Sequence, residues 1–193
     1  MNLQLAIVLL PGLIIGLTIH EASHALSAKL LGDRTAYKMG RVSLNPFRHL
    51  SLLGTAVLFL VGFGWGKPVL VNLYNFKKPK LHYLLTSLAG PFSNLLLAAA
   101  ALGTLYLKPY WVISFLAYSV FFVNIILFVV NLVPIPPLDG SKIWPCLIPG
   151  LRPVVSAKWS MFWVVFLIII FYTNAIGWLI GHVFALLTPL LPA

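Results

Sequence analysis

Long apolar runs set the pattern of this chain. Four of them are long enough to cross a bilayer as a helix, which takes about 20 residues, and they cover residues of about 3–31, 81–107, 111–133 and 159–187. A fifth run, residues 52–63, is short for a full crossing. The pattern predicts about four full transmembrane helices plus a short or re-entrant segment.

The region 35–73, between the first two of these spans, loses the helical pattern. Residues 37–39 and 41–44 alternate between apolar and polar side chains on either side of Gly40, and residues 69–72 are expected to add another short strand. Alternation with a period of two is typical of strands. We therefore expect a small β-hairpin or sheet next to the helices, within this re-entrant and β region.

Composition supports an integral membrane protein. Of the 193 residues, 61% are hydrophobic and 8% are charged, against about 25% charged in soluble domains. The fold class is therefore predicted to be an all-α polytopic membrane protein in contact with the lipid bilayer. Thirteen Lys and Arg residues outnumber three acidic ones, and the basic loops gather on one side, which the positive-inside rule makes cytoplasmic. The basic residues are scattered and form no aromatic-basic groove, so nucleic acid is not an expected partner.

Three ionisable side chains stand together inside the first span: His20, Glu21 and His24. Residues four apart on a helix share one face, about 6 Å apart along the axis. This spacing lets His20 and His24 bind one Zn²⁺, while Glu21 can accept a proton from a water there. Ionisable groups at membrane depth are costly, so they indicate function. The triplet predicts a zinc site nearer the cytoplasmic end of the span.

The third metal ligand must come from elsewhere, and two other acidic residues are available. Asp33 lies past the end of the first span, about 13 Å along the axis from His24, and is expected to pair with a loop arginine instead. Asp139 follows Pro134, Pro136 and Pro137, which cannot continue a helix. Broken backbone at membrane depth is tolerated where it lines a cavity, so Asp139 is the predicted third ligand.

Three motifs in this order resemble the core motifs of the site-2 protease family: residues 20–24 (HEASH), 89–94 (AGPFSN) and 131–140 (NLVPIPPLDG). Shorter matches lie at residues 31–33, 44–46 and 62–68. The resemblance runs from about residue 12 to residue 145, which is most of the chain.

The resemblance implies an intramembrane zinc metalloprotease with one Zn²⁺ per chain and Glu21 as its general base. Its partners would be membrane-protein substrate helices, whose transmembrane or membrane-proximal peptide bonds it would hydrolyse. By the same resemblance, Asn94 and Asn131 help to position substrate or to stabilise the oxyanion. Residues 1–193 are expected to form a single integral-membrane protease domain, a minimal member without PDZ or CBS domains.

Two other functions fit part of the pattern. A metal-ion transporter could use the same ligands, but it needs ligands along a path to both sides and would not need Glu21. A catalytically inactive membrane scaffold would not need the intact ligand set. We expect a multi-pass protein of a prokaryotic cell membrane, with its active site nearer the cytoplasmic side.

Overall fold

The structure is a computed structural model that describes residues 3–51, 54, 66–151, 173 and 175–192. Within these ranges the secondary structure is helical. The elements are α1 (Leu3–Leu30), α2 (Thr35–Lys38), η1 (Pro46–Arg48), η2 (Leu73–Asn75), α4 (Pro79–Tyr106), α5 (Trp111–Asn131), α6 (Gly140–Leu147), α8 (Ala175–Leu187) and η4 (Thr188–Leu190).

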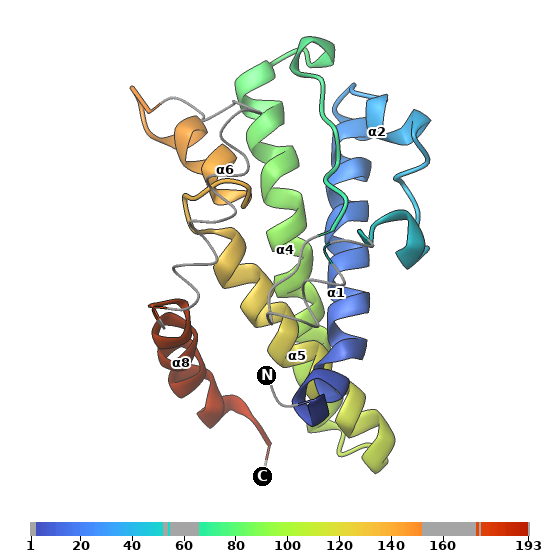
Figure 1. Cartoon of the computed structure of the whole chain (residues 1–193), viewed down its shortest axis with the longest axis vertical. Helices are drawn as coiled ribbons and strands as arrows, with labels where there is room; N and C mark the ends of the chain where they lie inside the picture. The colour runs from blue at the N-terminus through green and yellow to red at the C-terminus, as the bar shows by residue number, and fades with distance from the viewer. Residues whose placement is uncertain (1–2, 52–53, 55–65, 152–172, 174, 193) are drawn as a thin grey trace.

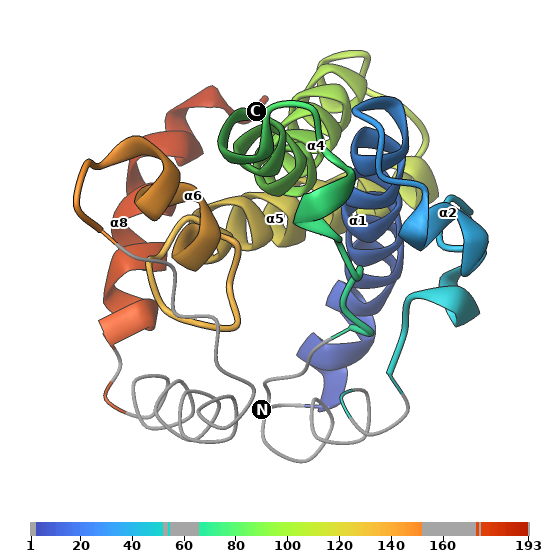
Figure 2. The same ribbon diagram turned by 90° about the horizontal axis from the view of Figure 1, so that it is seen from above.

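The three long helices α1, α4 and α5 pack against one another and alternate in direction (Figures 1 and 2). Each is long and apolar enough to cross a membrane. Their bounds agree closely with the predicted core spans, because a predominantly apolar run of about 20 residues crosses a bilayer as a helix, which satisfies its own backbone hydrogen bonds. The chain is therefore an integral membrane protein. Helix α6 packs against α4, near the end where α1 finishes and α4 begins (Figure 1).

Two expected segments fall partly or wholly outside the described residues. The short or re-entrant run 52–63 lies outside them except for Gly54. The expected C-terminal span 159–187 is described mainly over its second half, where α8 covers Ala175–Leu187.

Small residues allow α1 and α5 to approach closely. A Cβ added at Gly12 would lie 2.2 Å from the backbone oxygen of Ser119, and one added at Gly16 would lie 2.8 Å from Asn124 Oδ1. Glycines four residues apart are a common means of close packing between membrane helices. In addition, the Gly12 N–H donates a hydrogen bond to Ser119 Oγ at 3.0 Å. These contacts bring α5 against the half of α1 that precedes the histidines.

The predicted β-hairpin is wrong. Where strands were expected over residues 37–44, the described chain forms the short helix α2, a turn and the 3-10 turn η1. Local signals explain the difference. The Asp33 carboxylate accepts from the Thr35 N–H at 3.0 Å, which starts a turn, and Gly40 ends it at a φ of 70°. Seven alternating residues could not outweigh these turn signals.

Residues 69–72 also form no strand in the described structure. Pro68 has no N–H to offer a neighbouring strand, and the Asn72 N–H donates to Asp33 Oδ2 at 2.7 Å instead. Pairing in this region is limited to one isolated antiparallel bridge between Leu50 and Gly66 among the residues described. The expected small sheet is therefore replaced by a loop held to the end of α1.

Asp33 is the centre of that attachment. It is fully buried, and besides Thr35 and Asn72 it accepts from Asn75 Nδ2 at 2.7 Å. No arginine pairs with it among the described residues, contrary to the sequence-based expectation. Burial by itself raises the pKa of the Asp33 carboxyl, but the hydrogen bonds from Thr35, Asn75 and Asn72 outweigh burial and hold the pKa below its usual value.

Candidate metal centre

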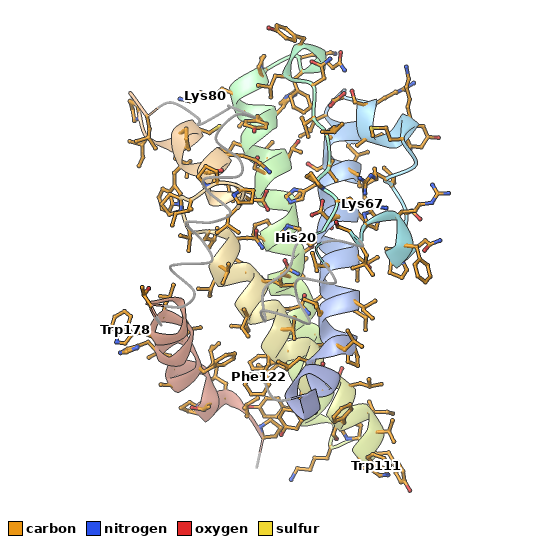
Figure 3. The ribbon with its side chains drawn as sticks, in the orientation of Figure 1. His20, Lys67, Lys80, Trp111, Phe122 and Trp178 are labelled. Carbon is orange, nitrogen blue, oxygen red and sulfur yellow. The ribbon has the colours of Figure 1, made fainter. Side chains whose placement is uncertain are left out.

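A group of polar side chains occupies the interior between the long helices, at the level of His20 (Figure 3). His20 and His24 lie on the face of α1 that meets α4, while Asp139 immediately precedes α6. The exposed fractions of these three residues are 4%, 6% and 4%. One potential ligand atom from each lies within 4.8 Å of the others. The structure thus brings together three residues that the sequence separates by up to 119 positions.

The ring of His24 is oriented by a backbone group. Its Nδ1 lies 2.7 Å from the carbonyl oxygen of Thr86, and a carbonyl only accepts, so Nδ1 carries the proton. In the neutral ring Nε2 then presents a lone pair. That lone pair lies 3.0 Å from both His20 Nε2 and Asp139 Oδ2. Electron-pair donors converging in this way require a positive charge between them.

The spacing of the three atoms suits a zinc ion. The His20 Nε2 to Asp139 Oδ2 distance is also 3.0 Å, so the three atoms form a nearly equilateral triangle. Tetrahedral Zn²⁺ with bonds of about 2.0–2.1 Å holds its ligands roughly 3.3 Å apart. A small outward rotation of each side chain is enough to reach that spacing. Two imidazoles and one carboxylate also leave the fourth position open, as catalytic zinc sites do.

Each candidate ligand has its own supporting partner. His20 Nδ1 lies 2.6 Å from Asn94 Oδ1. The second carboxylate oxygen of Asp139, Oδ1, accepts a hydrogen bond from Lys142 Nζ at 2.8 Å. Lys142 therefore leaves Oδ2 as the atom that faces the histidines. Partners of this kind fix the orientation of metal ligands in proteins.

Gly90 makes room for the two histidines on α4. A Cβ at this position would lie 2.3 Å from His24 Nε2 and 2.7 Å from His20 Cε1. These distances are shorter than any real side-chain contact, so α1 and α4 can place the imidazoles in the helix interface only if residue 90 has no side chain. Gly90 is part of the second sequence motif, but the sequence alone does not show that the two imidazoles pack against it.

Glu21 lies next to the cluster and remains available. Its carboxylate makes no hydrogen bond or ion pair within the part of the chain that is described. Gly66 lies near it, since a Cβ built there would be 3.6 Å from Glu21 Oε1. The loop from Gly66 onwards thus passes beside the predicted general base.

The two asparagines of the predicted site lie in different surroundings. Asn94 is fully buried and hydrogen-bonded to His20. Asn131 is partly buried at the end of α5, and its Nδ2 donates to the Leu127 carbonyl one turn earlier at 2.9 Å. The sequence analysis missed Lys142, although its position three residues after Asp139 suits an ion pair within one helical turn.

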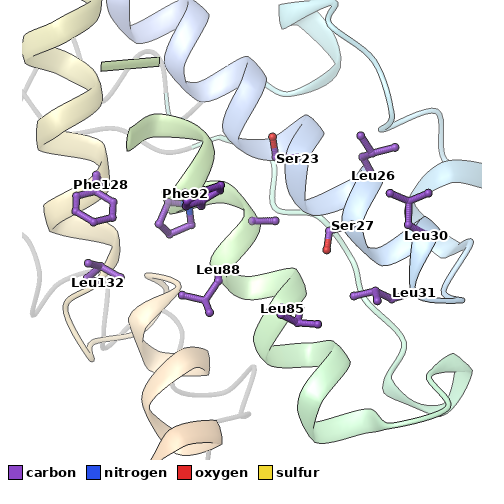
Figure 4. Close-up of a pocket in the computed structure, with 12 residues that line it drawn as sticks. Ser23, Leu26, Ser27, Leu30, Leu31, Leu85, Leu88, Phe92, Phe128 and Leu132 are labelled. Carbon is purple, nitrogen blue, oxygen red and sulfur yellow. The ribbon is translucent and has the colours of Figure 1, made fainter. Parts of the chain in front are cut away.

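The bundle also has an apolar groove of about 590 Å³, which is shown in Figure 4. None of the three candidate ligands lines it. Its lining comes from α1, α4 and the end of α5, and consists of Ser23, Leu26, Ser27, Leu30, Leu31, Leu85, Leu88, Ala89, Pro91, Phe92, Phe128 and Leu132. The groove and the polar cluster are therefore separate features of the bundle.

Comparison with known proteins identifies the family. The chain is 41% identical over 168 residues to "Putative zinc metalloprotease YwhC" of Bacillus subtilis, which covers 81% of this chain and 77% of the relative. It is 33% identical over 193 residues to "Putative zinc metalloprotease Rip2" of Mycobacterium tuberculosis, covering 92% of this chain and 72% of the relative. The sequence model of the family described as "Peptidase family M50" matches residues 108–172 of this chain. The chain belongs to peptidase family M50.

Membership of family M50 confirms the resemblance to site-2 proteases and the predicted class, an intramembrane zinc metalloprotease with zinc as its cofactor. The His20, His24 and Asp139 cluster provides a donor set that suits this metal. No solved structure matches the chain.

Proposed function

We propose that His20, His24 and Asp139 bind one zinc ion and that Glu21 is the general base of a peptide-bond hydrolysis inside the membrane. The observation that carries this proposal is the convergence of three ligand atoms within 4.8 Å. Two of them come from α1, the helix that also carries Glu21, whose carboxylate has no hydrogen-bond or ion-pair partner among the described residues. When bound, zinc lowers the pKa of water and polarises a carbonyl oxygen.

The proton transfers of the hydrolysis are assigned to Glu21. Glu21 accepts a proton from the attacking water, whose oxygen adds to the scissile carbonyl carbon. Glu21 then returns the proton to the amide nitrogen, the C–N bond breaks, and a carboxyl and an amine terminus are released. His20, His24 and Asp139 are buried, which limits the access of bulk water and lipid to these steps. The positioning or oxyanion role that the resemblance implies for Asn131 stays a prediction.

The substrates we propose are transmembrane or membrane-proximal segments of other membrane proteins. Residues 1–193 would act as one protease domain in a prokaryotic cell membrane, with the site nearer the cytoplasmic side. The charge distribution supports this orientation. Of the basic residues described, Lys108 lies at the far end of α4, whereas the others lie towards the end where α1 finishes.

The experiment that tests the proposal combines zinc analysis with cleavage of a transmembrane substrate in detergent or vesicles. Wild-type protein should contain about one zinc per chain, and His24→Ala should lose most of it. Glu21→Gln keeps the shape of the side chain but cannot accept a proton, so it should retain zinc and lose cleavage. Substantial cleavage by Glu21→Gln would show that another group acts as the base.

A further inference from the structure

Two fully buried amide side chains lie behind His20, in the interior of the bundle. Asn94 comes from α4 and Asn124 from α5, and the exposed fraction of each is 0%. Asn94 Oδ1 lies 2.6 Å from His20 Nδ1, and Asn94 Nδ2 donates to Asn124 Oδ1 at 2.7 Å. Asn124 Nδ2 in turn donates to the Val120 carbonyl at 2.8 Å. A continuous chain of hydrogen bonds thus runs from α5 through α4 to the histidine on α1.

Backbone carbonyls set the direction of this chain. An asparagine could in principle be rotated so that its oxygen and nitrogen exchange places. Asn94 Nδ2, however, also faces the Gly16 carbonyl at 3.3 Å, and Asn124 Nδ2 faces the Val120 carbonyl. Carbonyl oxygens only accept hydrogen bonds, so both NH₂ groups must point away from His20. The atom of Asn94 that faces His20 is therefore its oxygen.

We propose that Asn94 and Asn124 are positioning residues that hold His20 in the tautomer with its proton on Nδ1, which leaves Nε2 free to bind zinc. This inference rests on the proposed function and adds the reason why His20 presents the correct nitrogen. His24 obtains the same tautomer from the Thr86 backbone, which no side-chain substitution removes. His20 alone of the two histidines depends on side chains for this purpose.

The assignment changes the expected role of Asn94. Its two N–H groups are both used, one on Asn124 and one on the Gly16 carbonyl. Asn94 thus has no N–H left to donate to an oxyanion, and it acts through His20 rather than on substrate.

The first experiment compares two substitutions of Asn94 by competition of the purified protein with a zinc chelator. Asn94→Leu has a similar size but no acceptor for the His20 N–H, and should raise the zinc Kd by about 10–100-fold. Asn94→Asp retains the acceptor oxygen, and should bind zinc nearly as tightly as wild type although it loses both donors. Thr104→Val is the control for a hydrogen-bonding residue on the exposed side of α4, where Thr104 Oγ1 donates only to the Ala100 carbonyl.

The second experiment tests whether the two asparagines act in series. Asn124→Leu removes the acceptor that orients Asn94, and should weaken zinc binding by less than Asn94→Leu does. Because Asn124 acts only through Asn94, adding Asn124→Leu to Asn94→Leu should weaken zinc binding no further. ¹⁵N-histidine labelling gives a direct readout, since the Nδ1–H signal of His20 should persist in Asn94→Asp and be lost in Asn94→Leu.

The outcomes separate this inference from the proposed function. If Asn94→Leu binds zinc as tightly as wild type, or if the two asparagine substitutions weaken zinc binding additively, the positioning role is refuted while the ligand assignment stands. If Asn94→Asp keeps its thermal unfolding temperature but loses zinc as Asn94→Leu does, the acceptor is not what matters, and the inference fails. If wild-type protein binds no zinc through His20, the proposed function and this inference fall together.

Discussion

Replacing Gly90 by alanine tests the close approach of α1 and α4 at the metal centre. The added Cβ would lie 2.3 Å from His24 Nε2 and 2.5 Å from His24 Cε1. Restoring an ordinary contact of at least 3.4 Å requires the imidazole to move by about 1 Å, which is large for a metal ligand. Overpacking of this kind costs about 1–3 kcal/mol, and a 1 Å displacement at a reacting centre costs about 100-fold in rate.

Gly90→Ala should therefore reduce zinc content and lower cleavage of a transmembrane substrate by about 100-fold. Zinc is measured by mass spectrometry of the purified protein, and cleavage by the appearance of the product on gels. The same helix provides a matched control, because a Cβ at Gly103 meets nothing within 4 Å. Gly103→Ala should leave both measurements unchanged and, since alanine is the better helix former by about 1 kcal/mol, should not lower the thermal unfolding temperature.

One result would refute the reasoning. If Gly90→Ala retains a full equivalent of zinc and wild-type cleavage while Gly103→Ala does the same, the histidines do not lie against α4 at residue 90. The helix packing that brings His24 to the Thr86 carbonyl would then have to be different as well.

Two further predictions follow from contacts away from the histidines. Lys142→Met removes the partner of Asp139 Oδ1 and should raise the zinc Kd about 10–100-fold. Lys142→Arg should restore the affinity, and the exposed Lys80→Met is the control. An unchanged zinc Kd in Lys142→Met would show that Lys142 does not orient Asp139. The lowered pKa of Asp33 means that its stabilising effect is complete above the ordinary carboxyl pKa of about 4 and is lost as pH falls through the folded value. Asp33→Asn leaves the Asn72 N–H without its acceptor and should lower the free energy of unfolding by about 1–3 kcal/mol at neutral pH. It should also flatten the loss of thermal stability below about pH 4. An unaltered pH profile of thermal stability would show that Asp33 does not stabilise the loop.

The spans and the histidine pair could be predicted because both depend on local sequence. A predominantly apolar run of suitable length crosses lipid as a helix, and the spacing of His20 and His24 places them on one face of it. Asp139 could be proposed by elimination, since so few acidic residues are present. The contact between Asp139 and the histidines depends on how α6 packs on α4, which the sequence pattern does not show.

Other features could not be predicted from pattern alone. The strand interpretation of residues 37–44 failed because alternation over so few residues is weaker than a turn started by Asp33 and ended by Gly40. The direction of the Asn94 and Asn124 hydrogen bonds depends on the rotation of α4 and α5 about their axes. Apolar periodicity in a membrane span is too weak to fix that rotation, because lipid-facing and buried positions are both apolar.

The position of Asp139 after the three long helices has a consequence for the timing of biosynthesis. On the proposed ligand set, a nascent chain contains both histidines long before the carboxylate, which follows His24 by 115 residues. At about 5–20 residues per second, this interval is on the order of 10 s. During this interval the emerging protein has only two of its three metal-binding groups. The protease is therefore inactive while it lies in the translocation machinery, among unfolded membrane segments that it could otherwise cut.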